Sequence, residues 1–248
     1  MTARSSAAAA FTLVELLVVV GIIAVLMVLM VPAFTTIKGG SDVTSAAYQI
    51  AGVLEQARTH AIAHNTYVWV GFYEENANSV SATSATPPYP GKGRVLIGIV
   101  ASRDGTEILD QGDPATPLPA AKLVSLGKLV RLENLHLVDI GAPTGGDETR
   151  LDGRPRSPYQ GGFATQNRIS SENTEQTKFP FTEQGYTFHK TIRFSPTGEA
   201  RINSTYNYRN VAEIGLRPTH GTTVDTTTRN VAAVQLTGVS GAVKIYRR

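Results

Sequence analysis

One carboxylate interrupts an otherwise apolar run near the start of the chain. Glu15 lies within Phe11 to Val31, FTLVELLVVVGIIAVLMVLMV. A charged side chain at the centre of a bilayer costs roughly 2.5–3.5 kcal/mol on insertion scales, so Glu15 needs a partner. Cleavage just before Phe11 would create one, because a free α-amine has a pKa of about 7.7–8 and is largely cationic near neutral pH. The spacing predicts that Glu15 can pair with this amine one helical turn away.

Other residues with catalytic or ligating chemistry form weaker patterns. His60 and His64 have the i, i+4 spacing of metal ligands on a helix, but they lack an HExxH pattern and an evident third ligand, which favours a solvated helix edge. Phosphate-binding glycine loops and a nucleophile elbow are absent, and the chain has no cysteine. We therefore predict no enzyme activity, no metal site and no cofactor.

Basic residues are dense in the final third of the chain, where they could line a phosphate groove. The formal net charge is only +3, so composition alone gives no evidence for nucleic acid. A solvated sheet face with a basic tail is the favoured interpretation, and DNA binding is the alternative. The candidate nucleic-acid contacts are Arg201, Arg209, Arg217, Arg229, Lys244, Arg247 and Arg248.

The elements that would position Glu15 begin with a helix. Residues 11–31 would be roughly 31 Å long at about 1.5 Å per residue, close to the thickness of a hydrocarbon core. Gly21 and Pro32 are expected to weaken this helix locally. The small residues Ser5 to Ala10 precede the apolar run, whereas a secretory signal has its cleavage site after that run. A plain single-pass anchor remains the alternative.

A second helical stretch and several strands are expected beyond the apolar run. Gly39 and Gly40 should break the helix, and Asn65 is a stop signal. Tyr67 to Tyr73 reads as a β-strand, because it is rich in aromatic and branched residues. The helical stretch presents one apolar face, formed by Val43, Ala47, Ile50, Leu54, Ala57 and Ala61.

The remainder of the chain alternates between strand-like and loop-like composition. Val95 to Ala101 and Leu129 to Ile140 have the apolar character of strands, and 141–183 is polar and glycine-bearing, typical of a long surface excursion. Ser195 to Gly198, SPTG, predicts a turn between two strands. Gly238 and Gly241 mark the turn of a closing hairpin.

The apolar run, with Ala10 before Phe11 and Glu15 four residues later, resembles the N-terminal signature of type IV prepilins and type II secretion pseudopilins. Ala10 replaces the usual glycine of that signature. EQARTHAIAHNTYVWVGF, IRFSPTGEARI and VAAVQLTGVSGAVKIYRR resemble blocks of the GspH/FimT-type minor pseudopilins. In overall style the chain is also similar to pilin-like cassette proteins of verrucomicrobial bacteria.

This resemblance implies an α+β, pilin-like fold in which a long N-terminal helix, transmembrane in its first half, packs on an antiparallel β-sheet. It implies cleavage between Ala10 and Phe11, N-methylation of Phe11, and pairing of Glu15 with the terminal amine of a neighbouring subunit. The implied function is a structural minor pilin or pseudopilin in a secretion pseudopilus or pilus-like filament. The implied partners are other pilin subunits, prepilin peptidase, an inner-membrane assembly platform and membrane lipid, with DNA as the alternative ligand.

The expected organisation has four parts. Residues 1–10 form a leader peptide, 11–34 a transmembrane and assembly helix, and 35–65 the soluble half of the helix. Residues 66–248 form an exported β-rich domain with a loop-rich insertion near 141–183. Arg4 in the short leader predicts a single-pass inner-membrane protein with its C-terminal domain in the periplasm.

Overall fold

The structure is a computed structural model that describes residues 12–78, 85–108, 116–140, 151, 168–174, 179–202, 211–227 and 229–247. Within the helix, the side chains of residues 29–41 lie outside this description. The chain divides into two compact units, Met1–Lys38 and Gly39–Arg248. Helix α1, Leu13–Ala63, contributes to both units.

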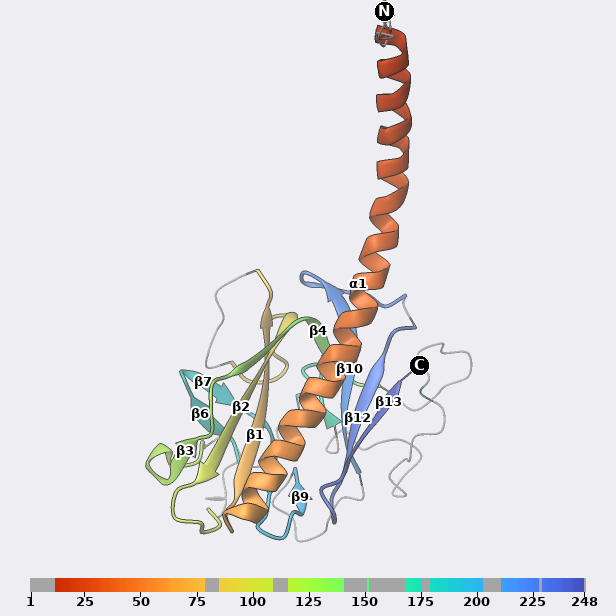
Figure 1. Ribbon diagram of the computed structural model, residues 1–248. Helices are drawn as coiled ribbons and strands as arrows, with labels where there is room; N and C mark the ends of the chain where they lie inside the picture. The colour runs from red at the N-terminus through yellow and green to blue at the C-terminus, as the bar shows by residue number, and fades with distance from the viewer. Residues whose placement is uncertain are drawn as a thin grey trace, which may run out of the picture. The chain divides into compact units, whose positions relative to one another are not determined.

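An antiparallel sheet dominates the second unit (Figure 1). Its main path has the order β13-β12-β10-β4-β2-β1-β8-β9, with β3, β5 and β11 paired outside this path. A short 3-10 helix, η1, spans Ala120–Lys122, and β6 and β7 form a separate hairpin. The strands are β1 Val68–Asn76, β2 Gly93–Ser102, β3 Leu123–Ser125, β4 Val130–Val138, β5 Arg168–Ile169, β6 Phe181–Glu183, β7 Tyr186–Phe188, β8 Lys190–Phe194, β9 Ala200–Arg201, β10 Val211–His220, β11 Thr223–Val224, β12 Ala232–Thr237 and β13 Val243–Arg247.

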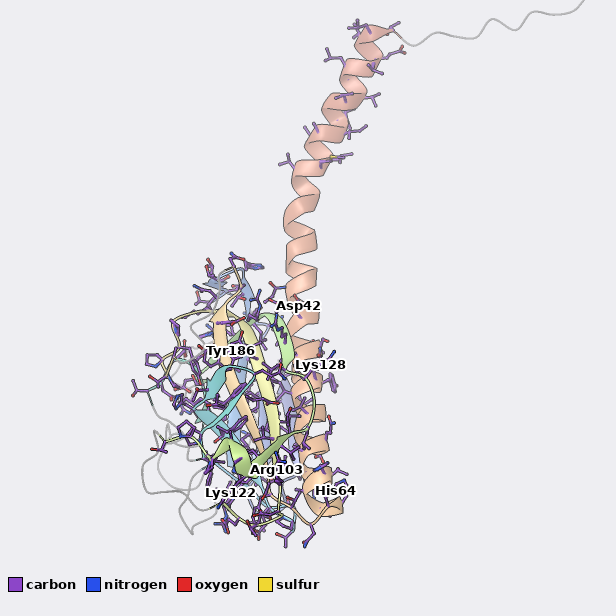
Figure 2. All side chains as sticks on the ribbon, turned by 90° about the vertical axis from the view of Figure 1, so that its left-hand side faces the viewer. Asp42, His64, Arg103, Lys122, Lys128 and Tyr186 are labelled. Atoms are coloured by element: carbon purple, nitrogen blue, oxygen red, sulfur yellow. The ribbon has the colours of Figure 1, made fainter. Side chains whose placement is uncertain are left out.

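The C-terminal part of α1 covers one face of the main sheet (Figure 1). The predicted apolar face is confirmed, because all six of its residues are buried in the core cluster that the helix shares with the sheet. The helix ends as predicted: Asn65 has a φ of 49°, and the Thr66 N–H donates to the Ala61 carbonyl at 3.0 Å. This left-handed residue and the backward hydrogen bond terminate the helix and reverse the chain into β1. Figure 2 shows Asp42 and His64 at opposite ends of the sheet-packed part.

The opposite face of the sheet carries an aromatic cluster covered by the β6–β7 hairpin. Trp69 and Tyr73 of β1 belong to this cluster, together with Phe181 and Phe188 of the hairpin. The rings of Phe181 and Phe188 stack with centroids 5.0 Å apart. Because β1 is buried on both faces, its first six residues are apolar or glycine instead of alternating with polar residues.

Several predicted strands are confirmed by the structure. β1, β2 and β4 occupy the three stretches predicted as strands between residues 67 and 140. β8 and β9 flank the SPTG turn, in which Gly198 has a φ of 83°, and β12 and β13 form the closing hairpin with Gly241 at 63°. Parts of the stretch predicted as a loop-rich insertion pack into the domain, since Ile169 and Phe181 are fully buried.

The predicted pilin-like fold class is wrong. The second unit is mostly antiparallel sheet, and α1 contributes described side chains to its core only from Val43 to Ala61. The predicted break at Gly39 and Gly40 is also wrong, because α1 continues through both glycines and through Pro32.

The predicted transmembrane helix and the single-pass inner-membrane location with a periplasmic domain are wrong as well. Among the residues that the structure describes, no helix is both long and apolar enough to cross a bilayer.

Gly71 sits where the aromatic cluster approaches the backbone of β1. A Cβ at this position would lie 2.5 Å from the Phe188 Cβ and 2.8 Å from the Phe181 Cζ. We expect Gly71→Ala to lower the free energy of unfolding by about 1–3 kcal/mol through overpacking. Urea unfolding of the variant and the wild type measures this difference.

Gly52 is the matched control, because it is exposed on α1 and a Cβ there would meet nothing within 4 Å. Gly52→Ala should raise the stability by about 0.5–1 kcal/mol through helix propensity. Equal effects of the two substitutions would contradict the close approach at Gly71.

Candidate functional site

The N-terminal part of α1 exposes a continuous apolar surface. Thirteen large hydrophobic side chains between Leu13 and Val28 are exposed, with exposed fractions from 45% at Val19 to 79% at Leu13. Figure 2 shows their side chains projecting on both sides of the helix. Consecutive positions such as Leu16, Leu17 and Val18 are all exposed, so the apolar surface surrounds the helix instead of forming one stripe.

Glu15 caps the start of this helix. The Thr12 N–H and the Thr12 hydroxyl each donate to Glu15 Oε2 at 2.9 Å, and the Glu15 N–H donates to the Thr12 Oγ1 at 3.2 Å. This reciprocal pair is a capping box, which satisfies backbone donors that have no partner within the helix. Hydrogen bonds from the Thr12 backbone and side chain lower the pKa of Glu15. This capping role was not predicted from the sequence, although the Thr-x-x-Glu spacing is its signature.

The predicted processing residues, Ala10 and Phe11, lie outside the described residues. Pairing of Glu15 with an amine at Phe11 therefore stays a prediction. A Cβ at Gly21 would meet nothing within 4 Å, and α1 runs through this glycine without a break.

The predicted nucleic-acid contacts are distributed over the sheet. Arg201 lies on β9 and Lys244 on β13, which are the two ends of the strand order, whereas Arg217 lies on the central β10. The Lys244 Nζ is 5.0 Å from the centre of the Tyr246 ring. Arg247 on β13 donates from Nη2 to the Asn230 Oδ1 at 3.4 Å.

The remaining members of this basic set do not extend the pattern. Arg229 lies in the exposed loop before β12, and Arg209 and Arg248 are outside the described residues. The described members come from β9, β10, β13 and a loop, and these positions give no support for a single phosphate-binding line. DNA binding through these residues remains an untested alternative.

The two helical histidines lie close together. The His60 and His64 rings have centroids 4.2 Å apart. Partial burial and the neighbouring His64 lower the pKa of His60. Within the described ranges, no group of three or more His, Cys, Asp and Glu side chains is placed to hold a metal ion.

A polar hollow of about 160 Å³ lies where α1 meets the start of β4. Asp42, Ser45 and Gln49 line it from the helix, and Glu133 and Asn134 from the strand. The Asn134 Nδ2 donates to the Asp42 Oδ2 at 3.1 Å, and the Gln49 Nε2 donates to the Ser45 Oγ at 3.0 Å. The polar groups that line the hollow thus bind one another. The hydrogen bond between Asn134 and Asp42 links the strand to the helix.

A buried ionic network that the sequence analysis missed lies within the sheet. The His136 Nδ1 is 2.8 Å from Glu74 Oε1, and its Nε2 is 3.0 Å from Glu172 Oε1. The side chains of Glu74 and His136 are 0% and 1% exposed. The only local signal is a pair of glutamates, Glu74 and Glu75, in a strand whose first six residues are apolar or glycine. Nothing near His136 in the sequence indicates its partners.

Comparisons with known proteins found no match: no family model, no curated protein and no solved structure corresponds to this chain. The site therefore has to be interpreted from its own geometry. Its most unusual feature is the apolar helical surface of Leu13–Val28.

Proposed function

We propose that this chain is a structural subunit, of the minor pilin or pseudopilin kind, which assembles into a pilus-like filament through the helix Leu13–Val28. The supporting observation is the exposure of thirteen large hydrophobic side chains on this helix. Fully burying one such side chain contributes roughly 1.5–3 kcal/mol, so the segment has a strong drive to associate.

In the proposed assembly, the apolar surface of one copy is covered by the Leu13–Val28 helices of other copies. Because the helix is apolar on all sides, one partner would leave much of it in water. Several neighbouring helices cover it better, and a filament supplies several neighbours to each subunit. This favours an open assembly over a closed dimer.

The charge of Glu15 would then be enclosed by neighbouring apolar helices. Thr12 already donates two hydrogen bonds to this carboxylate, but they leave its negative charge uncompensated. A terminal amine on Phe11, formed when prepilin peptidase removes residues 1–10, would compensate that charge. We therefore include cleavage and N-methylation of Phe11 in the proposal.

Glu15→Gln tests the charge within the assembly. Glutamine keeps an oxygen that can accept from the Thr12 N–H, but it cannot balance an amine enclosed by apolar helices. Leaving one partner of a buried pair uncompensated costs about 3–5 kcal/mol, so we expect co-purification of two differently tagged copies to fall by more than about a hundredfold.

Glu55→Gln is the matched control on the same helix. Glu55 makes a partly exposed ion pair with Arg58 at 3.3 Å on the helix surface, and such a pair contributes little. Intact mass of protein isolated from its native host reports cleavage and methylation directly. Unprocessed protein, or equal co-purification of Glu15→Gln and the wild type, would overturn this part of the proposal.

A further inference from the structure

The segment Arg168–Asn173, here called the strap, lies along β4 and β10. Its first two residues form β5, which pairs in parallel with Glu213 and Ile214 of β10. The Ser171 N–H donates to the Leu137 carbonyl of β4 at 3.1 Å. The Ser170 hydroxyl donates to the same carbonyl at 3.3 Å. Side chains also attach the strap, since Ile169 is fully buried in the core cluster and the Ser171 hydroxyl donates to the Leu137 carbonyl at 3.0 Å.

His136 joins the strap to the sheet. One ring nitrogen faces Glu74 on β1 and the other faces Glu172 on the strap, at 2.8 and 3.0 Å. Carboxylates only accept hydrogen bonds, so the imidazole can satisfy both only when both of its nitrogens carry a proton. A neutral ring would face one of the two carboxylates with a lone pair.

The remaining groups around His136 hold the carboxylates in place. Glu74 accepts from the Leu137 N–H at 3.1 Å and the Gly93 N–H at 3.3 Å, and also from the Ser171 hydroxyl. Glu172 accepts from the Asp139 N–H at 3.0 Å. Glu74 is therefore held by two N–H groups of the sheet and by the Ser171 hydroxyl of the strap, whereas Glu172 itself belongs to the strap.

Other charged groups lie near the strap on the neighbouring elements. Arg217 of β10 is opposite His136 in the β4–β10 register, and Lys92 acts electrostatically on Glu172. The Arg168 Nη1 is 3.6 Å from the Asp139 Oδ2, and the Lys190 Nζ donates to the Asn173 Oδ1. Of this set, His136 is the group whose ordinary pKa lies nearest to neutral pH.

We propose that His136 is a proton-operated clasp: its imidazolium fastens the strap to the sheet, and loss of one ring proton releases the strap while the sheet stays folded. Burial lowers the pKa of His136, but the hydrogen bonds and charges of Glu172 and Glu74 outweigh burial and raise this pKa to about 9. The hydrogen bond from His136 lowers the pKa of Glu172 despite its partial burial.

The direction of the pH effect follows from these two shifts. The raised pKa of His136 stabilises the closed strap fully below the ordinary value of 6.5, and this stabilisation is lost as the pH rises through about 9. The lowered pKa of Glu172 stabilises the closed strap above the ordinary value of 4.5, and this stabilisation is lost in more acidic solution. The strap is thus held most tightly between about pH 4.5 and pH 6.5, the ordinary pKa values of the two side chains.

The size of the effect has an upper limit. A pKa difference of about 2.5 units corresponds to a change of about 300-fold in an opening equilibrium. Glu74 stays beside His136 when the strap leaves, so only the share due to Glu172 is lost. We expect the opening equilibrium of the strap to rise at least about tenfold between pH 7 and pH 10.

Hydrogen exchange of the full-length chain, followed by mass spectrometry and corrected for the intrinsic pH dependence of exchange, tests the clasp. Peptides covering 168–174 should lose protection between pH 7 and pH 10, while peptides covering β12 should keep theirs. In His136→Gln this pH dependence should disappear. Glu172→Gln should reduce the pH dependence of strap protection about tenfold or more. The Glu172 side chain is 39% exposed, so this variant tests the clasp even if His136→Gln fails to fold.

His220→Gln is the control, since the exposed His220 lies on the same sheet and its Nε2 is 3.8 Å from Asp225. It should leave the exchange of the strap unchanged. The clasp is refuted if strap protection in the wild type does not depend on pH, or if the dependence survives in both His136→Gln and Glu172→Gln. Simultaneous loss of protection in the strap and β12 would refute it too, because this would indicate global unfolding.

Discussion

The double variant Val19→Asp, Ile23→Asp should leave the chain monomeric. The two positions are one turn apart on α1, 45% and 46% exposed, and surrounded by other exposed apolar side chains. In the proposed assembly each aspartate would be enclosed by neighbouring helices without a partner, which costs several kcal/mol per charge. We expect self-association to weaken by more than about a thousandfold, which corresponds to about 4 kcal/mol. Sedimentation velocity over a range of concentrations measures this loss.

The matched control places the same two charges on the sheet domain. Val124→Asp with Val239→Asp changes valines that are 42% and 62% exposed outside the apolar helix. This variant should associate like the wild type. Equal behaviour of the two double variants would contradict assembly through Leu13–Val28, and so would a wild-type chain that stays monomeric at high concentration.

Leu54→Ala should cost about 2–5 kcal/mol of unfolding free energy. Leu54 is fully buried on the face of α1 that packs on the sheet, and it shares the core cluster with residues of most of the main strands. Alanine would leave a cavity that these strands can fill only by shifting together. Urea unfolding followed by circular dichroism gives the difference.

Gln56→Ala is the control for this substitution, since Gln56 is exposed on the opposite side of the same helix. Its effect should stay within about 0.5 kcal/mol. A loss at Leu54 as small as that at Gln56 would mean that the helix does not depend on the sheet for its burial.

The elements that sequence predicted correctly are those with a strong local pattern. The period of Val43, Ala47, Ile50 and Leu54 matches one buried face of α1, and Asn65 ends the helix in the left-handed conformation that asparagine tolerates. The turn glycines Gly198 and Gly241 and the apolar run of β1 were likewise sufficient to predict the turns and the strand. These patterns depend on neighbours along the chain, which the sequence displays directly.

The elements that sequence missed depend on partners far along the chain. β10 contains Glu213, Gly215 and Pro218, which disfavour a strand, yet it pairs with both β4 and β12 within the sheet. Tertiary pairing overrides its weak local preference. His136 has its two carboxylates 62 and 36 residues away, so local spacing could not reveal them.

The candidate assembly site was only partly predictable. The apolar run and Glu15 are evident in the sequence, but the inference of a transmembrane helix and an inner-membrane location was wrong. The hydrogen bonds between Glu15 and Thr12 were also not predicted, although the Thr-x-x-Glu spacing is typical of a capping box. A carboxylate near the start of an apolar helix can serve the helix end itself.

The pairing of β1 with β8 has a consequence for synthesis of the chain. Val68 and Phe194 face each other in that ladder, so one edge of β1 stays open until more than a hundred further residues have left the ribosome. During that interval β1 presents an apolar strand with unpaired backbone groups, which invites pairing with other nascent chains. A cell that makes this protein must shield that edge or complete the polypeptide quickly.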